Sequence, residues 1–401
     1  MERGPGTSDH SESAGTTRPA PGTAVRPGGT ARPATPRTAR LINDRAAYEL
    51  LLDRGPLTRA QLRELTGLSR PTVAELIDRL TADGLIAVVG EAGADRRGPN
   101  ASVYGVVADR AHVAGVEVRA EKVIAVRADV TGRVVGRAEL PLDPDATPDT
   151  QVLAALDAAG GTSSPAAVVV GTPGLVDPAT GDVSYVAALP TWHHNLLPGL
   201  RAHLSVPVVV DNEVNLAGLA EHRLGAARGR DTFVLLSVGT GLGVAVVLAG
   251  KPLRGASGGA GEIGYIPYAA TDSNPVGNLQ GLVGGPAVLA LAASHGATGD
   301  LLGPAVRAAA GHPGFLDALA ERVTVGVVGL CAVLDPGFVV LAGEVGHAGG
   351  DALAERVAAR LAAAVPLPTE VRAGTVTDSP VVAGAVLTAL DLVHRNTFRT
   401  D

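Results

Sequence analysis

The sequence has a single cysteine and few aromatic residues, and both shortages limit what the protein can be. Cys331 is the only cysteine among 401 residues, so a disulfide within one chain is excluded and a reducing compartment is expected. This residue lies in the apolar run VGVVGLCAVL, which favours a small core residue over a nucleophile. Aromatic residues make up 2% of the chain, so the cores must be built from Val, Leu and Ala.

Long hydrophobic runs are also missing. Charges, Gly or Pro interrupt every apolar stretch before it reaches the length of a membrane span, and the N-terminus lacks the apolar core of a signal peptide. We therefore expect a cytoplasmic protein with no membrane partner. The net charge of −7 argues against a protein that coats nucleic acid indiscriminately, but residues 1–100 hold 14 Arg and 12 acidic residues. A mildly basic N-terminal segment followed by an acidic remainder is compatible with an N-terminal DNA-binding domain.

Changes in composition divide the chain into three parts. Residues 1–40 consist largely of Pro, Gly, Thr, Ala and Arg, which cannot bury enough apolar surface to fold, so we expect a disordered tail. Residues 41–107 show helical periodicity and then two strand-like runs. Residues 108–401 alternate strand-like and helix-like segments, as an α/β architecture requires.

The second part has the pattern of a winged helix-turn-helix. Thr58 and Gln61 form a capping-box pattern for a short helix that ends at Gly67, and Ser69 is the expected N-cap of the next helix, which ends at Gly84. That second helix has one apolar stripe, made by Val73, Leu76, Ile77 and Leu80, which leaves its other side free to face DNA.

Two strand-like runs, LIAVVG and SVYGVV, follow the helices and flank a polar loop with Arg96 and Arg97 at its tip. This loop is typical of a wing that reaches phosphates or the minor groove. A three-helix packing module with no role on DNA is the alternative. The residues that we expect to contact DNA are Arg59, Ser69, Arg70, Pro71, Thr72, Glu75, Arg79, Arg96 and Arg97, although Arg79 could instead pair with Glu75 four residues earlier.

Residues 45 to about 395 resemble the ROK family of repressors and sugar kinases. The motifs GTPG, PTW, DNEVN, GTGLG, GAGEIGY and LDPGFVVLAGE follow one another in the family's order, and the preceding helices resemble the winged helix of the family's sugar-responsive repressors. The resemblance implies an actin-like, ribonuclease-H-like fold of two lobes, with a sugar bound between them, and an assembly of two or four copies.

The kinases of this family use a phosphate loop, a glycine turn and a catalytic base, and this chain departs from two of these features. The loop, which resembles D-x-G-G-T in kinases, here reads Glu117-Val118-Arg119-Ala120-Glu121, so both glycines are replaced and Glu121 would face a phosphate. The turn SVGTGLG is intact, but a tight hairpin needs such glycines anyway. The base, an Asp after Asn in kinases, is here Glu213, which is one methylene longer. We therefore expect no kinase activity.

The sugar site that the resemblance implies is only partly preserved. Gly171, Pro173, Gly174, Asn212 and Glu262 match the family's ligand-binding positions, whereas Ala188, Tyr265 and Val283 replace an Asn, a His and a Glu. The residues that we expect to line this site are Gly174, Asn212, Glu213, Glu262 and Tyr265. Relatives hold structural zinc with that His and three cysteines, and residues 265–285 contain neither residue type, so we expect no metal and no cofactor.

These observations favour a transcriptional repressor that binds a double-stranded DNA operator and senses a sugar-like effector. Three alternatives stay open: a bifunctional kinase and regulator, a regulator whose ROK domain only mediates assembly, and an interaction protein without a role on DNA.

Overall fold

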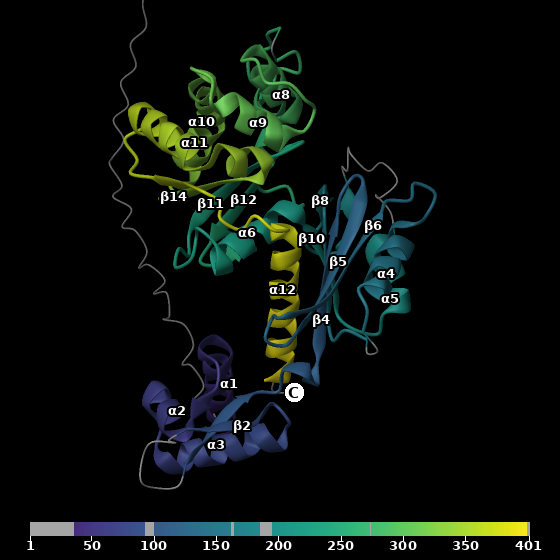
Figure 1. The fold of residues 1–401 in the computed structure, drawn as a ribbon, viewed down its shortest axis with the longest axis vertical. Helices are drawn as coiled ribbons and strands as arrows, with labels where there is room; N and C mark the ends of the chain where they lie inside the picture. The colour runs from purple at the N-terminus through teal and green to yellow at the C-terminus, as the bar shows by residue number, and fades with distance from the viewer. Residues whose placement is uncertain (1–35, 93–99, 162–163, 185–194, 273, 399–401) are drawn as a thin grey trace, which may run out of the picture.

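Three larger sheets, a two-stranded sheet of β8 (Leu175–Val176) and β9 (Val183–Ser184), and the helices around them form a head and a two-lobed domain in the described residues (Figure 1). The computed structural model describes residues 36–92, 100–161, 164–184, 195–272 and 274–398. The predicted tail lies outside these ranges except for residues 36–40, which belong to the first helix, α1 (Pro36–Arg54). Helix α1 therefore includes the last five residues of the segment predicted as a tail.

The head is a winged helix-turn-helix, as its sequence predicts. Its elements are α1, β1 (Leu57–Thr58), α2 (Arg59–Thr66), α3 (Arg70–Ala82), β2 (Ile86–Ala92) and β3 (Ala101–Val106). The capping box between Thr58 and Gln61 is formed, and Gly67 ends α2 in the left-handed conformation. The predicted stripe of α3 is buried, with Val73, Leu76, Ile77 and Leu80 each at most 3% exposed.

The first lobe is built on a five-stranded sheet in the order β10-β7-β4-β5-β6. Its strands are β4 (His112–Val118), β5 (Lys122–Asp129), β6 (Val134–Pro141), β7 (Val168–Thr172) and β10 (Val208–Asn212). Helices α4 (Pro148–Ala158) and α5 (Leu196–His203) cover one face. Helices α6 (Glu213–Leu224) and α12 (Pro380–Thr397) cover the other. Because β4, β7 and β10 are parallel neighbours, their carboxyl ends meet at one edge, where ligands bind in such sheets.

The second lobe has a sheet in the order β13-β12-β11-β14-β15. The strands are β11 (Phe233–Val238), β12 (Leu242–Leu248), β13 (Lys251–Pro252), β14 (Phe338–Ala342) and β15 (Glu370–Ala373). The helices around it are α7 (Leu279–Val283), α8 (Gly285–Ser294), α9 (Leu302–Ala310), α10 (Phe315–Leu334) and α11 (Gly343–Ala364). Cys331 is buried and unpaired in the core beneath these helices.

Helix α12 connects the domain with the head. It packs on α6 and β4, and in Figure 1 it runs along the first sheet towards the head. At its end, the ring of Tyr48 in α1 lies 5.8 Å from the ring of His394 and 5.5 Å from the ring of Phe398. The His394 ring also bonds through Nε2 to the carbonyl of Val130, at 3.2 Å. The C-terminal end of the chain therefore completes the core of the head.

Candidate nucleic-acid interface and ligand site

The start of α3 presents an exposed polar surface. Ser69 caps the helix, its Oγ accepting a bond from the Thr72 amide at 3.4 Å and lying 2.8 Å from Thr72 Oγ1. Arg70, Pro71 and Glu75 are exposed and Thr72 is partly buried. A capped, exposed helix start is the part of a helix-turn-helix that reaches base edges in the major groove.

Two other arginines of the head are held by its own side chains. Arg59 donates from Nε to the Tyr104 hydroxyl at 2.9 Å, while its side chain stays 53% exposed. Arg79 forms a two-bond ion pair with Asp44 of α1, with Nε–Oδ2 and Nη2–Oδ1 distances of 3.0 and 2.6 Å. It also lies 3.9 Å from Glu75, and its bonds to Asp44 tie α3 to α1.

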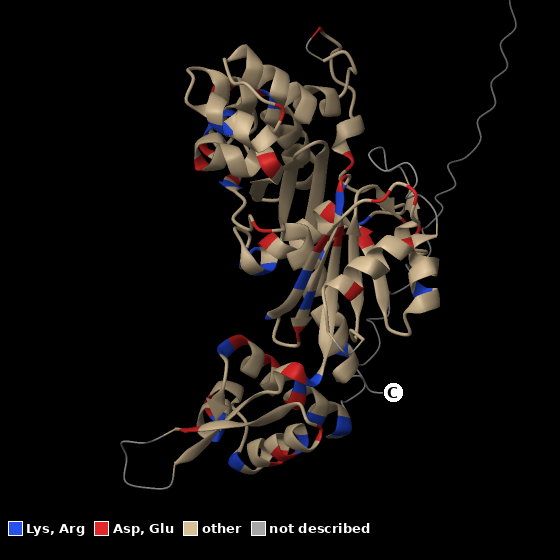
Figure 2. Cartoon of the chain, turned by 45° about the vertical axis from the view of Figure 1, so that its right-hand side comes forward, with Lys and Arg blue, Asp and Glu red and all other residues tan. Residues whose placement is uncertain are grey.

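Basic and acidic residues are mixed over the head in Figure 2 rather than gathered on one face. The remaining predicted arginines, Arg96 and Arg97, lie outside the described residues. A DNA surface on this head therefore depends on individual side chains more than on a broad positive field.

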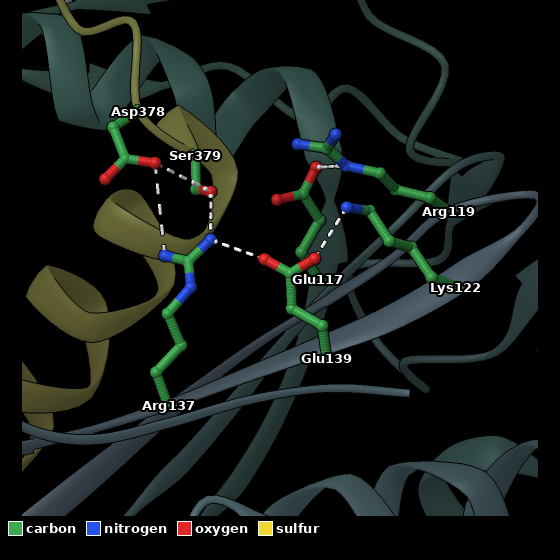
Figure 3. A network of polar contacts seen from close by, with 7 residues as sticks. All are labelled: Glu117, Arg119, Lys122, Arg137, Glu139, Asp378 and Ser379. Atoms are coloured by element: carbon green, nitrogen blue, oxygen red, sulfur yellow. Dashed lines mark hydrogen bonds and ion pairs between the residues drawn. The ribbon is translucent and has the colours of Figure 1, made fainter. Parts of the chain in front are cut away.

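The loop that would hold a phosphate in a kinase is here a tight hairpin filled by its own side chains. Glu117, at the end of β4, is 3% exposed, and its Oε1 accepts a bond from Arg119 Nε at 2.6 Å. The Arg119 amide donates to the Lys122 carbonyl, which closes the turn. Figure 3 shows the two side chains facing each other at this strand end.

The segment after β10 joins the two lobes. Asn212 caps α6, accepting bonds from the amides of Val214 and Asn215, and donates from Nδ2 to the Gly174 carbonyl at 2.9 Å. The preceding Asp211 is 2% exposed and is ion-paired with Arg254, which comes from the second lobe, at 2.5 Å. We refer to the strand ends at Glu117, Gly171 and Asp211, together with the loop 254–265, as the lobe junction.

Glu213 is the first residue of α6 and is partly exposed at the lobe junction. Burial of its carboxylate, with the nearby negative charge of Glu117, raises the pKa of Glu213 to about 7, and the Arg119 guanidinium only partly opposes this. Such a group changes its charge near neutral pH, which ordinary glutamates do not.

The glycine-rich loop of the second lobe lies against the first. A Cβ on Gly258 would fall 2.2 Å from the Val176 carbonyl oxygen, so only glycine allows this approach of the two lobes. Glu262 in this loop is partly buried, and burial raises its pKa. Tyr265 is 63% exposed. In the glycine turn between β11 and β12, Gln280 Oε1 accepts a bond from the Leu242 amide at 2.8 Å.

An asparagine holds the loop that carries zinc ligands in relatives. Asn274 is 1% exposed and donates from Nδ2 to the carbonyls of Ala269 and Asn278, at 3.3 and 3.1 Å. Within the described ranges, no group of three or more His, Cys, Asp and Glu residues could hold a metal. Val283, aligned with a ligand-binding Glu of the family, is 1% exposed in the core, and Ala188 lies outside the described residues.

The fold joins Gly174 to Asn212 by a hydrogen bond and places Glu213 directly after Asn212, while Glu262 lies in the second-lobe loop that approaches the first lobe at Gly258. The sequence missed the two arginines at these strand ends. In the sequence, Arg119 was noted only because it replaces a glycine of the kinase motif. Arg254 gave no local signal because its partner, Asp211, is 43 residues away. Two surface hollows lie elsewhere, one between α1 and α2 and one beside α10, so the lobe junction is identified by its chemistry rather than by its shape. None of the helices in the described ranges is both long and apolar enough to cross a membrane.

Comparison with known families divides the chain in the same way. The model of the ROK family matches residues 113–392, and that of the MarR family matches residues 49–98. The chain is also similar to the N-acetylglucosamine repressor of Escherichia coli O157:H7, with 27% identity over 250 residues. That match covers 60% of this chain and 61% of the repressor.

Two solved structures are similar in fold. A ROK family transcriptional regulator described as a homologue of the E. coli MLC protein superposes with a TM-score of 0.68 at 19% identity, over 90% of this chain and 99% of that one. A ROK hexokinase from Thermus thermophilus gives a TM-score of 0.57 at 27% identity, over 70% of this chain and 99% of that one. Both regulators and kinases therefore share this architecture.

Proposed function

The chain belongs to the ROK family, and we propose that it is a DNA-binding transcriptional repressor whose two-lobed domain senses a sugar-like effector. The observation that carries this proposal is a winged helix-turn-helix head beside a loop whose two positions aligned with the glycines of the kinases' phosphate loop hold Arg119 and Ala120. Similarity to a repressor along 250 residues supports the same view. We expect the protein to act in the cytoplasm, with its DNA.

In this proposal α3 lies in the major groove and its first turn reads base edges. Arg70, Thr72 and Glu75 supply donors and acceptors there, with Ser69 and Pro71 fixing the helix start. Arg59 and the wing arginines Arg96 and Arg97 would contact the phosphate backbone, and Arg79 would act mainly by holding α3 in place. Two heads of a homodimer, or of a tetramer, would bind a pseudo-palindromic operator.

Helix α12 is the proposed route from the effector to the head. Its first turn is joined to β6 by the bond from Arg137 Nη2 to Ser379 Oγ, at 3.1 Å, and its last residues contact Tyr48. A helix of 18 residues spans about 27 Å, and a packed helix moves as a unit. A change at the lobe junction would therefore shift the head, with a coupling of about 1–3 kcal/mol.

We propose further that the domain does not transfer phosphate. The Glu117–Arg119 pair occupies the loop that cradles phosphates in kinases, and its carboxylate would repel them. The glycine turn is occupied by Gln280 of α7, whose Oε1 accepts the Leu242 amide. These side chains support a sensor more than an enzyme.

The head is tested by Arg70→Ala in a gel shift on the DNA upstream of the protein's own gene. Loss of a base contact should weaken binding by about 1–3 kcal/mol, and loss of a phosphate contact should reduce the salt slope by about one. The matched control is Arg54→Ala, which removes an exposed arginine of α1 that pairs with Asp53. Full affinity in Arg70→Ala would count heavily against this proposal.

A further inference from the structure

Glu117 at the lobe junction has an oxygen whose hydrogen-bonding capacity is not met. Its Oε1 accepts the bond from Arg119, but its Oε2 is buried and has no hydrogen-bond partner among the described residues. The side chain is 3% exposed, so water does not readily replace the missing donor. A buried acceptor left without a donor costs about 1–3 kcal/mol, and more if it is charged.

Glu213 lies at the same edge of the first sheet as Glu117. Glu117 pairs in register with Gly171, and Gly171 pairs with Asp211, so the three residues form one row across the ends of β4, β7 and β10. The middle residue has no side chain, and Glu213 begins α6 two residues after Asp211. No described residue donates a hydrogen bond to the Glu213 carboxylate, and the charge of Glu117 helps to raise the pKa of Glu213.

The nearby cations are already engaged, as Figure 3 shows. Lys122 Nζ lies 2.7 Å from Glu139 Oε2, and Arg137 bonds to Glu139 and Ser379 at 2.9 and 3.1 Å and lies 4.0 Å from Asp378. In the second lobe, Arg254 is taken by Asp211.

Among the described residues, only Arg119 remains to balance Glu117 and Glu213. Glu121, on the same turn, adds a further exposed negative charge. With Glu121 set aside as solvent-exposed, the Glu117–Glu213 pair has one negative charge more than Arg119 offsets when both carboxylates are ionised, and each of the two carboxylates then has an oxygen without a described donor.

We propose that the effector carries a protonated amine, as an amino sugar or a similar aminated polyol does, and that its ammonium group binds between Glu117 and Glu213. This inference rests on the proposed effector-sensing function and names the chemical class of that effector. An ammonium group supplies three donors and one positive charge, which are the two things that the pair of carboxylates lacks. The sugar's hydroxyls would face Asn212 and Glu262.

Other ligand chemistries fit less well. A neutral sugar hydroxyl donates one hydrogen bond but leaves the charge in place. A phosphate or carboxylate would face two carboxylates of the same sign. Mg²⁺ requires near-octahedral oxygen coordination, and the described residues offer no group of three or more metal-ligating side chains.

The test measures binding of matched sugars to the full-length protein by calorimetry at pH 7. The probes are D-glucosamine, D-galactosamine and D-mannosamine, each with its N-acetyl derivative and its parent hexose, together with glucosamine 6-phosphate and MgCl₂ alone. At least one free amine should bind ten-fold or more tightly than its N-acetyl and hexose counterparts. Glu213→Gln and Glu117→Gln should each reduce that affinity by ten-fold or more, and Glu121→Gln, which changes an exposed carboxylate of the same turn, should not.

Three results would overturn the amine inference: a neutral or phosphorylated sugar that binds as well as every amine, binding of MgCl₂ at the same carboxylates, or an amine whose affinity is unchanged in Glu213→Gln. Glu213→Gln decides the matter even if Glu117→Gln fails to fold, because Glu213 is partly exposed. Binding of neutral sugars would leave effector sensing intact and remove only the amine. Binding of no probe, with DNA affinity retained, would count against the sensing function itself.

Discussion

The head and the lobe junction both contain buried carboxylates, but they treat them differently. In the head, Asp44 is 7% exposed and receives two bonds from Arg79. At the lobe junction, Glu117 is 3% exposed and receives one, with its second oxygen left without a donor. Native structures satisfy nearly all their buried polar groups, so an exception is informative. Asp44 is thus fully paired within the described part of the head, whereas Glu117 at the lobe junction keeps an acceptor oxygen without a donor.

The carboxylate of the head contributes to folding, whereas the carboxylates of the lobe junction are better explained by ligand binding. The Arg79–Asp44 pair fixes one helix on another and leaves the exposed start of α3 to read a partner. The Glu117–Glu213 pair works against folding, since two neighbouring carboxylates repel each other. Arrangements of side chains that destabilise the fold are expected where a protein binds its ligand.

The largest effect is expected from Tyr48→Ala, which breaks the contact between the two regions. Tyr48 is 1% exposed, with its ring packed against the rings of His394 and Phe398. Loss of a large buried aromatic costs about 3–5 kcal/mol, so the head should unfold at lower urea while the two-lobed domain keeps its midpoint. Urea unfolding followed by circular dichroism should then show two transitions.

Leu65→Ala, which truncates a side chain that is 46% exposed in the same head, is the control and should change stability by less than about 0.5 kcal/mol. Phe398→Ala removes the partner of Tyr48 at the end of α12. We expect it to reduce the change in DNA affinity that effector causes more than it reduces the DNA affinity measured without effector. If Tyr48→Ala lowered the urea midpoints of the head and the two-lobed domain together, the two regions would unfold as one unit. The difference in stability between them would then not exist.

A smaller, pH-dependent effect is expected from Glu213→Gln. The pKa of Glu213 is raised from 4.5 to about 7 in the folded protein, so between these values the folded state keeps a proton that the unfolded state releases. Stability therefore falls as pH rises through this window, and the full cost is present above about pH 7. Glu213→Gln should be more stable than the wild type at pH 8 by about 1–3 kcal/mol, with little difference at pH 4.

Thermal unfolding at pH 4, 6 and 8 measures this difference, and Glu121→Gln provides the matched exposed carboxylate. A stability gain of equal size at all three pH values would show that the Glu213 charge is not its source.

The sequence predicted the head well because its determinants are local. Thr58 and Gln61 are three residues apart, as are Ser69 and Thr72, and each pair forms the cap that its pattern indicates. The two-lobed architecture was instead an implication of the resemblance to the ROK family, which rests on the order of short motifs.

The ion pairs and hydrogen bonds between distant segments could not be predicted, because their partners are far apart in the chain. Arg79 meets Asp44 across 35 residues, Arg254 meets Asp211 across 43, and Arg137 meets Ser379 across 242. No periodicity or cap indicates such contacts. The surplus charge at the lobe junction becomes visible only once these pairs are known, since they decide which carboxylates are left without a cation.

The smallest effect is expected in an assay for kinase activity, where we predict no measurable turnover of sugar and ATP. Glu213→Asp restores the base found in the family's kinases, yet neither this variant nor the wild type should phosphorylate sugars with ATP in an ADP-coupled assay. A base at the right reach contributes only if the phosphate is held, and the Glu117–Arg119 pair fills the loop that would hold it.

The triple variant Glu213→Asp, Arg119→Gly, Ala120→Gly, which also restores both glycines, separates the two requirements. Turnover that appears only in this variant would assign the missing activity to the loop, whereas turnover in the wild type would overturn the view that the pair displaces phosphate. The contrast between the head and the lobe junction would then depend on Arg119. We expect the arginine–carboxylate pair at Arg119 to exclude phosphate because it lies in the loop that would hold it, whereas the pair at Arg79 ties one helix of the head to another.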